Sequence, residues 1–126
     1  MASINLVGFG YNEYEAVTGN KTLDAGDSGV VQNVTATATV TLPAIAAGTS
    51  NVTAIVRVGA EGKTVTISPN SGDKIVGNGF TAADDKDAIA TSQPAGSYIV
   101  LKGTNEATTD SAWTVERVLG TWTREA

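Results

Sequence analysis

The sequence predicts an all-β fold: a single-domain antiparallel β-sandwich, jelly-roll-like, with about eight short strands and an extended N-terminal arm. From Ser28 to the C-terminus, apolar residues recur with period two more often than with period 3.6. Clusters of Gly, Asn, Asp, Ser or Pro interrupt them about every eight to twelve residues. A length of 126 residues is typical of one domain.

The clearest strand pattern runs from Val34 to Leu42 and alternates in full. The threonines at 35, 37, 39 and 41 share one face, because successive side chains of a strand point to opposite sides. Pro43 ends the pattern, since proline cannot donate to a sheet ladder. The opposite, apolar face carries Val34, Ala36, Ala38, Val40 and Leu42.

Two further strands are expected at 51–58 and 63–68, joined by a hairpin loop over Gly59–Gly62. In the second of them Val65 and Ile67 point inward. The inward positions of the first are Val52, Ala54, Val56 and Val58.

Shorter strands are expected at 74–77, around Phe80 and at 88–91. The strand at 96–102 contains four consecutive apolar residues, Tyr98–Leu101. Such a run indicates either a central strand covered on both faces or a strand that lies against another subunit. Both interpretations bury Ile99.

The last long strand is expected over Ser111–Leu119, with Trp113 and Val115 pointing inward. Trp113 is interpreted as a core residue. Trp122, which follows Gly120 near the end of the chain, is either a core residue or part of an exposed platform that stacks on a sugar.

Residues 1–20 are expected to form an extended arm, and residues 21–126 the sandwich domain. The arm concentrates aromatic side chains, including Phe9, Tyr11 and Tyr14. Aromatic side chains are costly to leave in water, so they are expected to anchor on the same body or on a neighbouring molecule. A first strand tucked onto the sheet is the other interpretation of this segment.

The composition excludes the commonest sets of catalytic and metal-binding residues. The chain has no Cys and no His, which excludes thiolate nucleophiles, histidine triads and the usual zinc sites. Eight Lys and Arg against thirteen Asp and Glu give a net charge of −5 without a basic cluster, so nucleic acid is not an expected partner. No signal peptide and no membrane span are expected. No catalytic, cofactor-binding or metal-binding residue is assigned, and the chain is not expected to be an enzyme.

The acidic turn near residue 85 is the one candidate for a hard cation. Asp84, Asp85 and Asp87, with Asp73 upstream, offer carboxylate oxygens of the kind that Ca²⁺ prefers. Their spacing does not match a twelve-residue calcium loop that ends in a bidentate Glu, so a solvated turn is the favoured interpretation.

Several segments together resemble a known class of viral protein, the small all-β decoration (cement) proteins of tailed bacteriophage capsids. Similar modules occur in phage head fibres and tail fibres. The likeness covers roughly residues 22–123 and depends on turn and core positions. It is carried by Leu23–Val31, Val40–Ala44, Ala47–Gly48, Val65–Gly77, Gly96–Leu101, Trp113–Val115 and Gly120–Trp122.

This resemblance implies a structural virion protein, made in the cytoplasm of a bacterial host, that binds the outer capsid surface as a homotrimer. It would cement neighbouring subunits of the major capsid protein without a catalytic step. The alternative is a fibre or receptor-binding module that contacts a host glycan through Trp122 or the loop around Asp84. The residues predicted to lie at an interface with the capsid or another subunit are Phe9, Tyr11, Tyr14 and Trp122.

Overall fold

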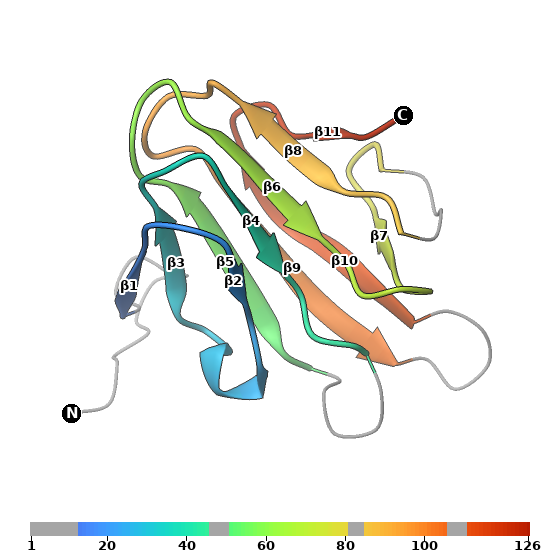
Figure 1. Cartoon of the computed structure of the whole chain (residues 1–126). Coiled ribbons are helices and arrows are strands. Elements are labelled where there is room, and N and C mark those ends of the chain that lie inside the picture. The colour runs from blue at the N-terminus through green and yellow to red at the C-terminus, as the bar shows by residue number, and fades with distance from the viewer. Residues whose placement is uncertain (1–12, 46–50, 81–84, 106–110) are drawn as a thin grey trace.

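A computed structural model of the chain describes residues 13–45, 51–80, 85–105 and 111–126. Within these ranges the chain is mostly β-strand, with one 3₁₀ turn, η1 (Ala25–Asp27), and no α-helix. Figure 1 shows the strands arranged in two facing sheets. The all-β prediction is therefore confirmed. None of the described segments is a helix long and apolar enough to cross a lipid bilayer.

The two sheets differ in size. The larger contains six strands, in the spatial order β1 (Tyr14–Val17), β3 (Val31–Val34), β5 (Thr53–Val58), β9 (Tyr98–Asn105), β10 (Ser111–Leu119) and β7 (Lys74–Val76). The smaller contains five strands, in the order β11 (Thr123–Arg124), β8 (Ala88–Thr91), β6 (Thr64–Ser68), β4 (Ala38–Thr41) and β2 (Lys21–Thr22).

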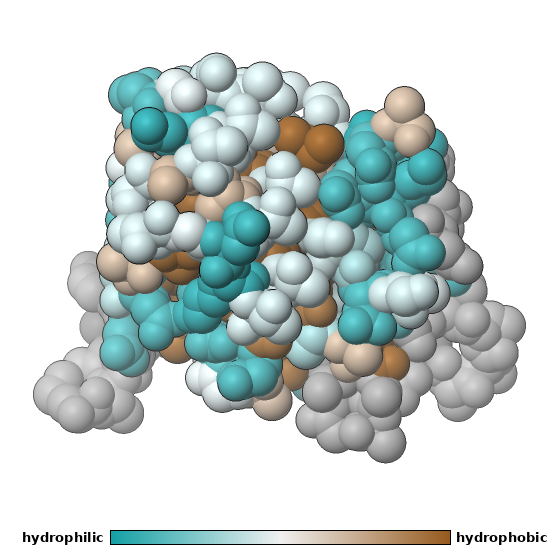
Figure 2. Space-filling view, in the orientation of Figure 1, coloured by the Kyte–Doolittle hydropathy of each residue, from teal (hydrophilic) through white to brown (hydrophobic). Residues whose placement is uncertain are grey.

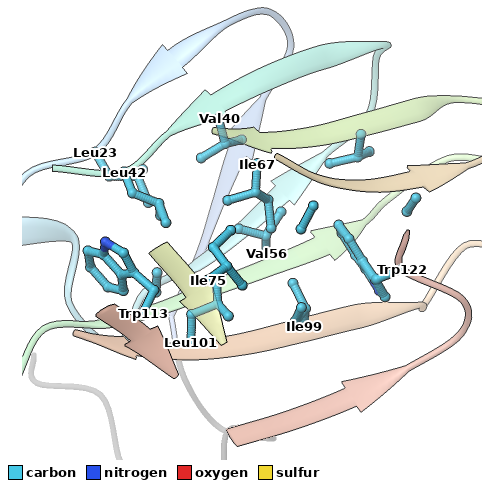
Figure 3. Close-up of a cluster of buried hydrophobic side chains, with 14 of the residues drawn as sticks. Leu23, Val40, Leu42, Val56, Ile67, Ile75, Ile99, Leu101, Trp113 and Trp122 are labelled. Carbon is cyan, nitrogen blue, oxygen red and sulfur yellow. The ribbon is translucent and has the colours of Figure 1, made fainter. Parts of the chain in front are cut away.

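One apolar core fills the space between the sheets (Figure 3). Val56 and Ile99 reach it from the six-stranded sheet, and Val40 and Ile67 from the five-stranded sheet; all four are fully buried. Trp113 is also fully buried, as the sequence predicts. Each of these side chains removes most of its apolar surface from water, which is the main favourable contribution to folding.

The first half of the chain crosses this core repeatedly. It passes from β1 to β2, from β3 to β4 and from β5 to β6, each time leaving the six-stranded sheet for the five-stranded one. Successive passes run in the same direction, so β1, β3 and β5 pair in parallel, as do β2, β4 and β6. Parallel neighbours require such a crossover, because a tight hairpin reverses the chain.

The prediction of purely antiparallel pairing is wrong. Five of the nine strand pairings among the described residues are parallel, and each of the four antiparallel pairings includes β8 or β9. The described residues contain eleven strands, whereas about eight were expected. The surplus includes the two-residue strands β2 and β11, which are too short to show a period in the sequence.

The predicted single strand over 34–42 is divided between the two sheets. Val34 ends β3 in one sheet, and Ala38 begins β4 in the other, with a bend between them. The alternation of apolar and polar residues continues through the bend because Val34 and Ala38 both face the core, one from each sheet. A period of two records which side chains are buried, but it does not record which sheet they belong to.

The connection at 59–62 was expected to be a hairpin, and this expectation is also wrong. β5 and β6 belong to different sheets, so the loop spans the edge of the core. The burial predicted for the two strands is nevertheless confirmed. Val52, Ala54, Val56 and Val58 are buried in β5 and just before it, and Val65 and Ile67 are buried in β6.

The six-stranded sheet begins earlier than the predicted domain boundary at residue 21. Tyr14–Val17 forms β1, in parallel register with Val31–Val34 of β3. Val17 belongs to the main core and is 3% exposed. Of the two interpretations of the N-terminal segment, a first strand placed on the sheet is the one that holds for residues 14–17.

A polar cluster ties this first pass together. The Lys21 Nζ atom of β2 donates to the Oε1 atom of Gln32 on β3 (2.8 Å) and forms an ion pair with Glu15 on β1. Asp27 of η1 lies 3.5 Å from the same nitrogen. Gln32 is fully buried, so its hydrogen bond to a charged donor satisfies an acceptor that water does not reach. The cluster joins the two sheets at the edge formed by β1 and β2.

Replacement of Ile67 by Ala should test the shared core. The side chain is fully buried, and Ile→Ala in such a site costs about 2–5 kcal/mol of unfolding free energy. Urea denaturation measures this loss. The matched control is Thr66→Ala on the outward side of the same strand, which should change stability by less than about 0.5 kcal/mol. Equal effects of the two substitutions would contradict the packing described above.

Candidate interaction surface

The six-stranded sheet has a second apolar layer on the side that faces away from the main core; we call this side the outer face. Two cross-strand rows of side chains run over it. The first row consists of Tyr14, Val31, Ile55, Val100 and Arg117, which are successive register partners. The second row consists of Ala16, Asn33, Arg57, Tyr98 and Leu119.

The centre of the first row is apolar and shielded from water. Val31, Ile55 and Val100 form a cluster of their own, separate from the main core, and none of them is more than 8% exposed. Tyr98 of the second row packs against the cluster. The run Tyr98–Leu101 is therefore apolar for two reasons: Ile99 and Leu101 enter the main core, whereas Tyr98 and Val100 belong to the outer face.

The two large hydrophobic residues that are most exposed among the described residues both lie on the outer face. Tyr14 is 50% exposed at the β1 edge, and Leu119 is 54% exposed at the end of β10. They stand at opposite ends of the two rows. Single exposed apolar residues are ordinary on protein surfaces. Here the cluster between the two is itself shielded from water, so Tyr14 and Leu119 supply the exposed large hydrophobic side chains of this face.

Arg57 lies between these two positions, in the second row. Its Nη1 atom donates to the Oδ1 atom of Asn33, its register partner on β3, at 2.6 Å. Its guanidinium group also stands over the ring of Tyr14, 5.7 Å from the ring centroid. At this distance the cation is within the range in which the ring quadrupole attracts it. Arg57 is thus oriented by two neighbours from two different strands.

Gly59 permits this arrangement. A Cβ atom at position 59 would lie 2.7 Å from the Oδ1 atom of Asn33, closer than two such atoms can approach. The absence of a side chain lets the Asn33 amide lie over the backbone just after β5, where it reaches Arg57. This glycine therefore has a steric role, since its backbone needs no special conformation.

The outward side of the five-stranded sheet has a different character. Figure 2 views the molecule from that side, and the surface over β4 and β6 is mostly pale or teal, with only small brown areas between. Threonines fill the outward positions there, at 39, 41, 64 and 66. The molecule therefore presents one polar side and one side with exposed apolar and aromatic residues.

The predicted interface residues have different outcomes. Tyr14 lies exposed on the outer face, in a strand of the sheet. Phe9 and Tyr11 lie outside the described residues. Trp122 does not fit an interface, because it is 7% exposed and belongs to the main core, where its Nε1 atom donates to the carbonyl oxygen of Leu119 (3.3 Å). Figure 3 shows Trp122 and Trp113 at opposite ends of the core.

Sequence reasoning missed the central residues of the outer face, Ile55 and Arg57. One signal could have found the first of them. Ala54, Ile55 and Val56 are consecutive apolar residues, so β5 buries both of its faces, as β9 does. Nothing in the sequence indicates that Arg57 meets Asn33 and Tyr14, because parallel pairing of distant segments brings them together.

The carboxylates of the predicted acidic turn mainly organise backbone. Asp73 is buried and accepts a hydrogen bond from the amide of Ile45 (2.9 Å). Asp85, in the left-handed region with φ 61°, accepts one from the amide of Gly72 (2.7 Å). Asp84 lies outside the described residues. No group of three or more metal-ligating side chains is found within the ranges that the structure describes.

Asp87 sits where the C-terminal strand meets β8. Its amide donates to the Oε1 atom of Glu125 (2.9 Å), and its carbonyl accepts from the amide of Glu125 (2.9 Å). Burial raises the pKa of its carboxyl group above 3.8, and the charge of Glu125 raises it further, whereas a hydrogen bond with Ser68 opposes both effects.

Comparisons with protein families, with curated proteins and with solved structures find no match to this chain.

The raised pKa of Asp87 predicts a pH-dependent stability. The folded state binds the Asp87 proton more tightly than the unfolded state does, so this contribution is complete below about pH 3.9 and is lost as pH rises through the raised pKa. Asp87→Asn should therefore be more stable than the wild type at pH 7, with a smaller difference at pH 4. Urea denaturation of both proteins at the two pH values measures this, and an equal difference at both would contradict the assignment.

Proposed function

We propose that this chain is a structural protein of a tailed bacteriophage particle. It binds the outer surface of the capsid and cements neighbouring subunits of the major capsid protein. The observation that supports this most is the outer face, which gathers Tyr14, Leu119, Arg57 and Tyr98 on one side of a β-rich body. Aromatic residues and arginine are enriched in protein–protein interfaces relative to other surface.

The proposal also draws on the likeness of the turn and core segments to capsid decoration proteins. It includes a single β-sandwich domain with mixed strand pairing, assembly as a homotrimer, and synthesis in the cytoplasm of the bacterial host. The two sheets that enclose a common core are compatible with such a sandwich. The jelly-roll-like description stays a prediction, which the parallel pairs do not favour.

The mechanism of cementing follows from the physics of association. A rigid β body spreads a preformed surface over the junction of two capsid subunits and loses little conformational entropy on binding. Binding to the assembled lattice, but not to separated subunits, stabilises the lattice by linkage. Many copies on one shell multiply this stabilisation.

Copy number separates a decoration protein from a fibre. Quantitative mass spectrometry of purified virions should find this chain at a copy number comparable with that of the major capsid protein, because a cement occupies repeated lattice sites. A fibre or receptor-binding module would be present in far fewer copies, and that result would contradict the proposal. Binding to a glycan array by the isolated chain would support the fibre alternative.

The outer face should be required for attachment. The double variant Tyr14→Ala, Leu119→Ala is expected to bind particles assembled without this chain at least about tenfold more weakly than the wild type, since truncation of interface anchors commonly costs more than 1 kcal/mol each. Co-sedimentation measures the affinity. Thr66→Ala, on the polar side of the molecule, is the matched control.

Thermal denaturation should confirm that both variants remain folded. If the double variant binds as tightly as the Thr66→Ala control, the outer face is not the surface that meets the particle.

A further inference from the structure

Arg57 is a half-buried cation beside the apolar cluster of the outer face, and within the described parts of the chain no carboxylate is found paired with it. Lys21 forms ion pairs with Glu15 and Asp27, whereas the contacts of Arg57 among the described residues are with the Asn33 amide and the Tyr14 ring. A guanidinium group in such surroundings gains more from a carboxylate partner than one in open water does, because the local dielectric is lower.

The guanidinium group is also held in place before any partner arrives. Asn33 accepts a hydrogen bond from one of its N–H groups, and the ring of Tyr14 lies within cation–π distance of it. Its other terminal nitrogen, Nη2, lies near Gly96. A Cβ atom added at position 96 would be 3.9 Å from this nitrogen. An orientation that is already fixed reduces the entropy lost when a planar carboxylate binds in the two-bond geometry that arginine favours.

The surroundings indicate which source of carboxylate fits. Arg57 is flanked in its row by Tyr98, and Tyr14 and Leu119 are exposed on either side. An aromatic and apolar ring around one arginine matches the centre of a protein interface. A nucleic acid or another polyanion would require several clustered cations, and the basic residues of this chain are scattered.

We propose that Arg57 is the charged anchor of the outer face and that it binds an Asp or Glu side chain on the surface of a partner protein. The partner thus carries an acidic residue bordered by apolar ones, which cover Tyr14 and Leu119. The inference rests on the proposed function where it takes the partner to be a capsid subunit. The charge and ring geometry that carry it are properties of this chain alone.

A pair of arginine variants tests the anchor on particles assembled without this chain. Arg57→Gln should weaken binding about tenfold or more, as the loss of an oriented charge pair does in other interfaces. Arg124→Gln removes the same charge from an exposed position on β11, in the five-stranded sheet, and should change binding less than threefold. Equal losses would show that only overall charge matters, and no loss in Arg57→Gln would overturn the proposal.

Zero-length cross-linking tests the chemistry of the partner. Arg57→Lys places an amine at the same position, and a carbodiimide joins an amine to a carboxylate in direct contact with loss of one water. Mass spectrometry should find residue 57 linked to an Asp or Glu of a particle protein. If the variant binds and this cross-link is absent, while other lysines of the chain are linked, the carboxylate assignment is wrong.

A third measurement requires no particle, so the two proposals can fail separately. The NMR signal of the Arg57 Nε–H group is followed while the chain is titrated with N-acetyl-Phe-Glu-Phe-amide or with the same peptide containing Gln. The Glu peptide should shift the signal more, and equal shifts would count against the anchor. A wild-type chain that responds to the Glu peptide but fails to bind particles would retain the anchor and refute the capsid proposal.

Discussion

Burial of one apolar layer between the two sheets is the constraint on which the rest of the structure depends. Val40 and Ile67 approach that layer from one side, and Val56 and Ile99 from the other. From β1 to β9 the chain fills both walls of this core by crossing between them at each step, so consecutive strands fall in opposite sheets, whereas β9 and β10 pair within one sheet. Strands of successive passes then become parallel neighbours within each sheet.

The same crossing explains why the candidate surface is assembled from distant segments. Tyr14, Asn33 and Arg57 come from three successive passes and meet because β1, β3 and β5 lie in parallel register. The sheet supplies a rigid support for this cluster, so its geometry does not depend on loop conformation. Placing recognition residues on strands in this way lowers the entropic cost of binding.

The outward sides of the two sheets differ in polarity. Threonines cover the outward side of the five-stranded sheet, whereas the outer face of the six-stranded sheet carries a second apolar cluster with exposed residues at its margins. Water is a good solvent for the first side and a poor one for the second. The proposed attachment to a larger assembly would use this difference, with the outer face toward the assembly and the threonine-covered side toward the solvent.

The sequence by itself determined many of the buried strand positions: alternation predicted Val65, Ile67 and Trp113, and the apolar run Tyr98–Leu101 predicted Ile99, all of which are in the core. It also determined the all-β class, because glycine-rich turns and a period of two leave no room for helices. Only the tertiary structure decided which sheet each strand joins, that Trp122 is buried, and that Arg57 meets Asn33 and Tyr14. The physical reason is that periodicity is a local property, whereas strand partners are chosen by long-range packing across the core.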